Sequence, residues 1–285
     1  MSNCVKYSDN WIKDFKNYPD NYFTKKYKFI KKFPGRGGGS VLLIKDKKSK
    51  KKYILKIFEI TKKVDFFEII NEIYISCVLG KNEKKIVPAF YKFGLLNNIN
   101  PYKKYNVKKA LNIYPFIVIE YINNYITLQK YCFQKHTLKD KLSVIFLIIY
   151  YMHHLYKKYR YYHNDFHLNN IMLSSKKYKQ IIIFKKKKYK LFCPKIKIID
   201  FGGSSINKMT YSKKSPVFSF FAFKKAFIKH PKLIKHIQKY KNSNKSDYKH
   251  LNAIIYILLH SENIKVPPLK TYYEFLSSSL FNVLL

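Results

Sequence analysis

The sequence predicts an α+β fold in which a small, β-rich half precedes a larger, mainly helical half. Short apolar runs separated by turn signals recur between residues 27 and 121 and are typical of strands. Longer apolar runs at 138–158 and 251–259 indicate helices. A chain of 285 residues can form one large domain or two lobes. We therefore expect two lobes, with a boundary near 122–125.

The first lobe is expected to contain five strands and one helix. A weak alternation leads into a glycine cluster, as in a strand that ends at a turn. Two apolar runs joined by the basic segment 45–52 then have the pattern of a hairpin, and helical spacing follows. The expected strands are 27–33, 40–44, 53–58, 86–93 and 114–121, and the expected helix is 64–79.

After the helix at 138–158, the second lobe is expected to hold short strands, loops and the helix at 251–259. The basic, hairpin-like stretch 176–190 is either a docking surface or a loop enlarged by neutral drift. The expected organisation is an N-terminal extension at 1–26, the first lobe at 27–121 and the second lobe at 122–285.

The chain carries 57 Lys and Arg against 16 Asp and Glu, a formal charge of +41. A genome rich in A/T codons would explain the preference for Lys over Arg but not the scarcity of acidic residues. A field of this size attracts nucleic acid, anionic lipid or acidic protein. An acidic protein or a nucleic acid is thus a candidate partner, and a solvated surface without a dedicated partner is an equal alternative.

The four cysteines are widely spaced and include no C-x-x-C pair, which favours a reducing compartment. The N-terminus lacks the apolar core of a secretory signal. The longest apolar stretch, 142–152, is shorter than the ~20 residues that a membrane span needs. We expect a soluble, intracellular protein of the cytoplasm without a membrane span.

A glycine-rich segment lies between two expected strands. Glycines there would let backbone N–H groups approach phosphate oxygens without a Cβ in the way. Such a segment is more often only a turn, so by itself it is weak evidence for a nucleotide loop. The residues concerned are Gly35, Gly37, Gly38, Gly39 and Val41.

Lys56 lies among apolar neighbours in an expected strand, where a lysine needs an anion to offset its desolvation. Phosphate oxygens and a helix carboxylate both meet that need. Glu72 on the next helix is the candidate partner, and Glu68, one turn earlier, competes with it. A lysine on an exposed face is the alternative, common in so basic a chain.

Two aspartates stand at the ends of apolar segments. Asp165 lies in the segment 163–172, five residues before Asn170, and Asp200 follows the apolar strand 196–199 and precedes a glycine. With so few acidic residues in the chain, these positions indicate function rather than accidental surface charge.

The order of these elements resembles that of the eukaryotic protein-kinase superfamily over residues 27–260. The resemblance implies that Asp165 accepts the proton of the attacking hydroxyl and that Asn170 and Asp200 coordinate Mg²⁺. It also implies that Lys56, paired with Glu72, holds the α- and β-phosphates of ATP while the glycine segment covers the phosphates.

By the same resemblance, residues 120–122 form the hinge that binds adenine through its backbone, with Glu120 and Ile122 at its ends. Ile119 would lie behind the hinge and Met172 beneath the adenine ring. Asp247, which precedes an apolar helix, resembles the aspartate that anchors the catalytic loop.

The chain departs from the family at several places. Its glycine segment is one residue short, no A-P-E motif follows Gly202, and only 38 residues follow Asp247. Asn164 replaces an arginine that often pairs with a phosphorylated activation loop, which predicts activity independent of phosphorylation at 210–212. His167 stands where serine/threonine kinases usually carry lysine. The residues 215–218 are a candidate peptide-facing loop.

The resemblance implies an ATP-dependent phosphotransferase, foremost a serine/threonine-type protein kinase acting on a protein hydroxyl. His167 and the missing A-P-E motif favour a small-molecule kinase of the aminoglycoside- or choline-kinase type. A basic, kinase-like binding protein without catalysis is the third hypothesis. The A/T-biased composition and the reduced second lobe would suit a large DNA virus or an intracellular parasite.

Overall fold

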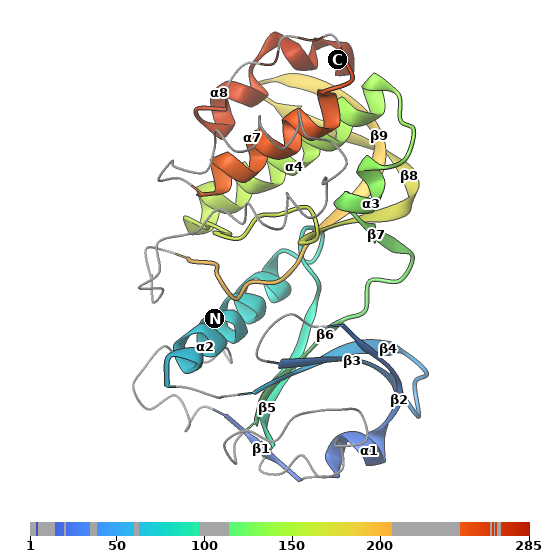
Figure 1. Ribbon diagram of the computed structural model, residues 1–285, viewed down its shortest axis with the longest axis vertical. Coiled ribbons are helices and arrows are strands. Elements are labelled where there is room, and N and C mark those ends of the chain that lie inside the picture. Colours follow the sequence, from blue (N-terminus) through green and yellow to red (C-terminus); the bar gives the residue numbers. More distant parts are fainter. Residues whose placement is uncertain are drawn as a thin grey trace. The chain divides into compact units, whose positions relative to one another are not determined.

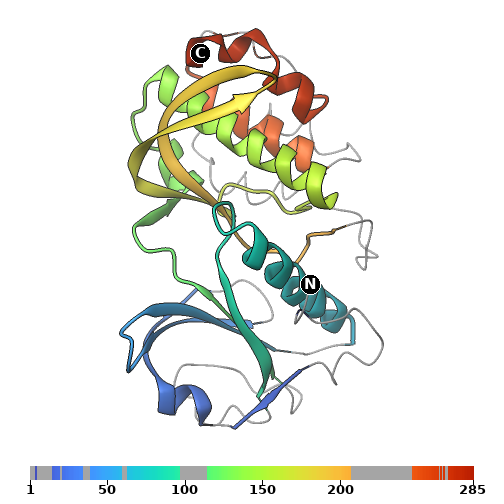
Figure 2. The same cartoon turned by 180° about the vertical axis from the view of Figure 1, so that it is seen from behind.

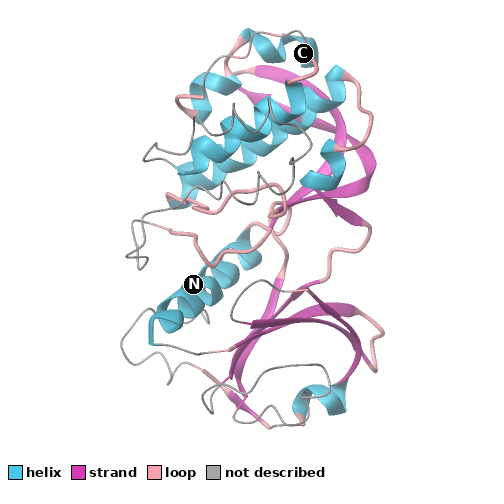
Figure 3. Ribbon diagram, in the orientation of Figure 1, coloured by secondary structure: helices cyan, strands magenta, loops and turns pink. Residues whose placement is uncertain are grey.

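The computed structural model describes residues 4, 15–19, 21–34, 39–59, 63–96, 114–206, 246–262, 264, 266 and 269–285. At 63–67 and 246 it describes only the backbone. Its contacts divide the chain after Asn123 into two compact units, and each is described by itself (Figure 1). Unit 1 is residues 1–123, and unit 2 is residues 124–285. Both units combine helices and strands, which confirms the predicted mixture of α and β structure (Figure 3).

Unit 1 contains a six-stranded sheet in the order β1-β5-β6-β4-β3-β2. All neighbouring strands are antiparallel except β1 and β5. The described residues of this unit also form the helices α1 (Tyr22–Lys26) and α2 (Lys63–Asn82). The strands are β1 (Asn17–Tyr18), β2 (Tyr27–Phe33), β3 (Gly39–Asp46), β4 (Lys52–Phe58), β5 (Phe90–Leu96) and β6 (Tyr114–Glu120).

Apolar clusters bury both faces of this sheet. Ile69, Ile70 and Ile73 of α2 join Phe90 and Ile117 of β5 and β6 in one cluster. The second cluster contains Phe23 of α1 with apolar residues of β3, β4 and β6. Since α2 packs on the strands through its buried face, its position follows from the sheet.

Three features of unit 1 differ from the sequence expectations. The strand expected at 86–93 begins only at Phe90, because the backbone N–H groups of Ile86 and Val87 donate to the carbonyl of Glu83 in a turn. β1 and α1 fall within the segment expected as an extension. Cys4 and Cys77 form a disulfide, which the expectation of a reducing compartment did not foresee.

Unit 2 contains the antiparallel sheet β7-β8-β9 and several helices. The strands are β7 (Tyr125–Thr127), β8 (Ile171–Phe184) and β9 (Lys187–Ile198). The helices are α3 (Leu128–Cys132), α4 (Leu138–Tyr159), α7 (Ser246–Leu259) and α8 (Tyr272–Leu276), with a 3₁₀ helix, η3, at Ser279–Leu284. The expectation of only short strands here was wrong, because β8 and β9 have 14 and 12 residues.

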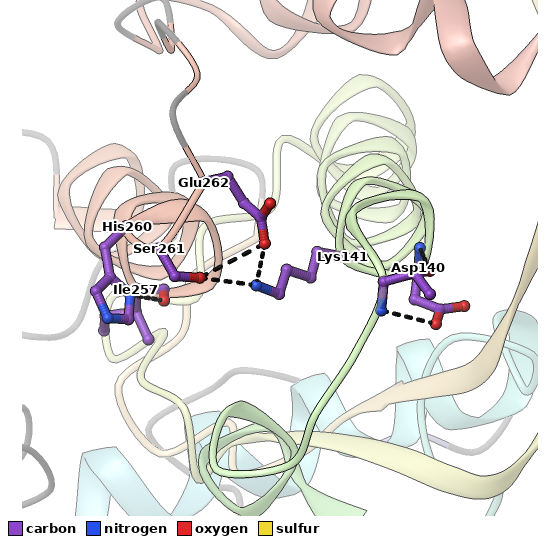
Figure 4. Close-up of polar contacts among 7 residues, drawn as sticks. Asp140, Lys141, Ile257, His260, Ser261 and Glu262 are labelled. Atoms are coloured by element: carbon purple, nitrogen blue, oxygen red, sulfur yellow. Dashed lines mark hydrogen bonds and ion pairs between the residues drawn. The ribbon is translucent and has the colours of Figure 1, made fainter.

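Helix α4 is the centre of unit 2. Phe146 in its middle contacts Tyr189 of β9 and Phe281 of η3, with ring centroids 4.4 and 5.1 Å apart. Near its start, Lys141 donates to Glu262 and Ser261, which follow α7 (Figure 4). None of the helices in the described part of the chain is long and apolar enough to cross a membrane.

The start of α4 is fixed by a capping box. The Thr137 hydroxyl accepts the backbone N–H of Asp140, and the Asp140 carboxylate accepts the backbone N–H of Thr137. This carboxylate also accepts from Lys177 of β8 at 2.7 Å. The cap therefore fixes the helix end and ties α4 to the hairpin.

We predict that Thr137→Ala lowers the free energy of unfolding by about 1 kcal/mol, because one backbone N–H at the helix start loses its acceptor. Urea denaturation measures the change. Thr137→Ser keeps the hydroxyl and should stay close to the wild type. Equal stability of the alanine and serine variants would show that the cap contributes nothing.

Candidate active site

In unit 1, Lys56 forms an ion pair with Glu72. The Lys56 Nζ lies 2.6 Å from Glu72 Oε1, and the side chains are 21% and 9% exposed. Glu68, the competing partner, has an exposed side chain. Lys56 is therefore not a lysine on an exposed face, and the carboxylate of α2 offsets the cost of its partial burial.

The glycine segment is described only at its end. Gly35, Gly37 and Gly38 lie outside the described residues. Gly39 begins β3, where a Cβ would lie 2.8 Å from the carbonyl oxygen of Ile57. Val41 pairs with Lys56 across β3 and β4. The close approach of two backbones is a sufficient structural reason for glycine at position 39.

The residues expected at the adenine hinge end β6. Glu120 is tied to Ala89, whose backbone N–H donates to Glu120 Oε2 at 2.9 Å and whose carbonyl accepts the Glu120 N–H at 2.8 Å. Ile119 packs against the α2 cluster, and Ile122 follows β6 with a half-buried side chain. In unit 2, Met172 is half-buried on β8 and pairs with Thr127 and Lys197.

Asp247, in the first turn of α7, holds the loop 163–170 of unit 2, which we call the acidic loop because it carries Asp165. Its two carboxylate oxygens accept the backbone N–H groups of His163 and Asn164, each at 2.7 Å. The Asp247 side chain is buried. Two hydrogen bonds to an ionised acceptor fix the loop backbone just before Asp165.

His163 and Asn164 connect this loop to the turn that carries Asp200. His163 Nε2 donates to the carbonyl of Ile199 at 3.0 Å, because a carbonyl can only accept. The Asn164 side chain donates to the carbonyl of Gly203 at 3.0 Å. The acidic loop and the Asp200 turn are therefore joined on both sides of Asp200.

Asn170 closes the loop around Asp165. Its Nδ2 donates to the Asp165 carbonyl at 2.9 Å, and its own carbonyl accepts the Ile199 N–H at 2.9 Å. His167 Nδ1 accepts the Asn169 N–H, so the His167 proton is on Nε2, which lies 3.6 Å from Asp165 Oδ2. An N–H thus faces the Asp165 carboxylate, which is 43% exposed.

Asp200 adopts a left-handed backbone conformation, with φ of 65°. A non-glycine residue there is uncommon and strained, and such residues cluster at functional sites. The next residue, Phe201, is buried with its ring 6.1 Å from that of His163. The buried Phe201 side chain therefore anchors the backbone next to the strained Asp200.

The site concentrates negative charge. Partial burial raises the pKa of Asp165 to about 7, and the charges of Asp200 and Asp247 add to the rise. Burial also raises the pKa of Asp247 to about 6, although the hydrogen bonds from His163 and Asn164 oppose it. A cation at this site would relieve the mutual repulsion.

The donor set fits Mg²⁺ better than a transition metal. Asn170 has its Nδ2 committed to Asp165, which leaves Oδ1 as its oxygen donor, and Asp200 supplies a carboxylate. Mg²⁺ is commonly held by one or two carboxylates together with phosphate oxygens. Within the described residues, no group of three or more His, Cys, Asp or Glu forms a metal site by itself.

Sequence reasoning selected Asp165, Asn170 and Asp200, and the structure brings the segments that carry them together in unit 2. Sequence reasoning did not identify the hydrogen bond between Asn164 and Gly203 or the one between His163 and Ile199. A single asparagine or histidine in a loop has no periodic pattern that would reveal its partner.

No family model and no curated protein matches the chain. Among solved structures, the chain is similar to the crystal structure of a kinase domain, with 18% identity and a TM-score of 0.44. The match covers 66% of this chain and 53% of that chain, so it spans about half of the solved chain's length. Likeness at this level establishes no activity, and the case for function depends on the geometry.

We predict a pH effect from His163, whose pKa burial lowers from 6.5 to about 4. The unfolded chain binds this proton first, so the histidine's contribution to stability is present above pH 6.5 and is lost as the pH falls toward 4. The loss is on the order of 3 kcal/mol. Denaturant unfolding across this range measures it.

Asp165 and Asp247 titrate in the opposite sense, because their raised pKa values make the folded state more stable as pH falls. Comparison with His163→Gln, which keeps an N–H donor for Ile199, isolates the histidine. His260→Gln, at an exposed position, serves as the control. An identical pH dependence in wild type and His163→Gln would refute the prediction.

Proposed function

We propose that the chain is an ATP-dependent phosphotransferase, and specifically a protein kinase of the serine/threonine type. The observation that carries the proposal is the loop 163–170, which joins Asp165 and Asn170 to the Asp200 turn and is held from below by buried Asp247. The Lys56 and Glu72 pair of unit 1 supports it independently.

Each residue has a distinct role in the proposed reaction. Asp165 accepts the proton of the attacking hydroxyl, and its raised pKa makes it a stronger base than an ordinary carboxylate. Asn170 and Asp200 hold Mg²⁺, which neutralises phosphate charge when bound. Lys56, oriented by Glu72, binds the α- and β-phosphates.

The remaining proposed contacts concern the nucleotide. The backbone of 120–122 binds adenine, Met172 packs beneath the ring, and the glycines at 35 and 37–39 cover the phosphates together with Val41. Glu120 shapes this segment through its hydrogen bonds with Ala89 rather than by contacting adenine with its carboxylate. Phosphoryl transfer depends mainly on positioning and charge neutralisation, which these groups supply.

A small-molecule kinase is the second candidate, and one observation favours it. His167 directs its Nε2 proton toward Asp165, at 3.6 Å, where a protein kinase of the serine/threonine type would place a flexible lysine. A histidine is shorter and more rigid than a lysine and does not supply the lysine's reach to the γ-phosphate, which favours a small-molecule acceptor.

We predict that Asp165→Asn and Asp200→Asn each lower phosphate transfer from labelled ATP at least ~100-fold, the scale for loss of a general base or a preorganised charge. A mixed protein substrate and a panel of small hydroxyl compounds serve as acceptors. Transfer to protein would support the protein kinase, and transfer only to small compounds would support the second candidate.

Glu72→Gln and Glu68→Gln form a matched pair on α2. The first removes the partner of Lys56 and should lower transfer strongly, whereas the second changes an exposed carboxylate and should have little effect. Equal activities of these two variants, or full activity of Asp165→Asn, would contradict the proposed roles.

We further predict that alanine at Thr210, Tyr211 and Ser212 together leaves transfer within about twofold of the wild type. These positions lie outside the described residues. The reason is that Asn164 already donates to Gly203, an uncharged contact that needs no phosphate. Steady-state kinetics of the phosphate-free triple variant provides the measurement, and complete loss of turnover would overturn the prediction.

A further inference from the structure

The hairpin β8–β9 has one packed face and one exposed face. Phe184, Tyr189, Leu191 and Cys193 are buried, and the ring of Tyr189 packs on Phe146 of α4. In Figure 2 the hairpin crosses in front of α4 with its other face outward. That outer face belongs to no contact needed for the proposed reaction.

The outer face alternates apolar and cationic side chains across the two strands. Ile181 pairs with Lys190, Ile183 with Lys188, and Phe192 with Lys179. The apolar side chains are 59%, 69% and 51% exposed, and the three lysines are also exposed. Every apolar side chain of this outer face therefore stands opposite a lysine.

The whole hairpin is positively charged. Residues 171–198 contain ten lysines and no aspartate or glutamate. Lys177, whose ammonium lies 5.9 Å from the centroid of the Phe192 ring, is paired with Asp140 of α4. The outer face is therefore electrostatically complementary to an anionic partner.

The tip of the hairpin keeps its charge at a conformational cost. Lys185 and Lys186 form the two-residue turn with φ of 50° and 62°. Turns of this geometry favour Asn and Gly, and lysine there is strained. The Lys185 ammonium lies 3.9 Å from the centroid of the Tyr273 ring of α8, whereas Lys186 adds positive charge to the exposed tip.

We propose that the outer face of β8–β9 docks on an anionic lipid surface. Lipid phosphates and the acyl boundary lie side by side at a membrane interface, so a surface on which lysine and isoleucine alternate can satisfy both at once. The lysine stems also extend along apolar surface while their ammonium groups reach the phosphates.

The two other anionic partners fit less well. Cores of protein interfaces are depleted in lysine, and here lysine interrupts every apolar contact. Single-stranded nucleic acid is bound by stacking on aromatic rings, and two of the three apolar side chains are isoleucines, which have no ring. The same residues therefore favour the lipid surface.

The test measures binding of the full chain to phosphatidylcholine vesicles with and without phosphatidylserine, at physiological salt. Wild type should bind only the anionic vesicles. Ile181→Thr with Ile183→Thr keeps the charge and the β-branched side chains and should weaken binding about tenfold. Val283→Thr, at an exposed apolar position of η3, should leave binding unchanged.

A second set separates the hairpin from the general charge of the chain. Lys179→Gln, Lys188→Gln and Lys190→Gln together should weaken binding at least tenfold. The control set, Lys28→Gln, Lys48→Gln and Lys51→Gln, removes the same charge from exposed positions of unit 1 and should have a much smaller effect. Equal effects of both sets, with no effect of the isoleucine changes, would overturn the proposal.

Two further variants guard against misfolding. Lys186→Gly, which keeps the contact of Lys185 with Tyr273, should raise the thermal midpoint or leave it unchanged while it weakens vesicle binding. Phe192→Trp, with Trp11→Phe, should show a blue shift of fluorescence on anionic vesicles. Absence of this fluorescence shift would show that the face does not serve a lipid surface. RNA binding of the same variants is measured in parallel, and hairpin variants that lose RNA binding while vesicle binding persists would show the same.

Discussion

The buried carboxylate of Asp247 is the constraint on which the acidic site of unit 2 depends. It accepts two backbone N–H groups at 2.7 Å, and these fix the residues just before Asp165. From there, His163 and Asn164 reach the carbonyls of Ile199 and Gly203 on either side of Asp200. Because its pKa is still raised to about 6, the hydrogen bonds offset the cost of burial only in part. The chain retains a costly buried charge at this point, which positions the loop.

In unit 1, too, scarce acidic residues occupy defined structural positions. The chain has 16 acidic residues against 57 basic ones, yet Glu72 pairs with Lys56 of β4 and Glu120 links β6 to Ala89, the residue before β5. The acidic site of unit 2 is thus a local reversal of a strongly positive field. That reversal favours a cation at Asp200 and Asn170, while the basic outer face of β8–β9 favours an anionic surface. Within unit 2, the proposed catalytic site and the proposed docking surface therefore carry opposite charge.

The sequence predicted most of the long elements, because apolar residues recur there with the period of a helix or strand, as in α4 and β6. It also selected Asp165 and Asp200, since scarce carboxylates at the ends of apolar segments stand out. The length of β8 and β9 was not predicted, because lysines occupy so many of the outward positions that the apolar alternation is weak. The Cys4–Cys77 disulfide joins positions 73 apart, and the contact of Asn164 depends on the tertiary fold, so neither has a local signal.

The central claim is that Asn170 and Asp200 hold a divalent cation beside bound nucleotide. A crystal structure with Mg²⁺ and a non-hydrolysable ATP analogue tests it most directly. The account predicts metal density bounded by Asp200 and Asn170 Oδ1, with phosphate oxygens completing the coordination and Lys56 Nζ on the α- or β-phosphate. Nucleotide bound away from these residues, or bound with no metal at Asp200, would contradict it.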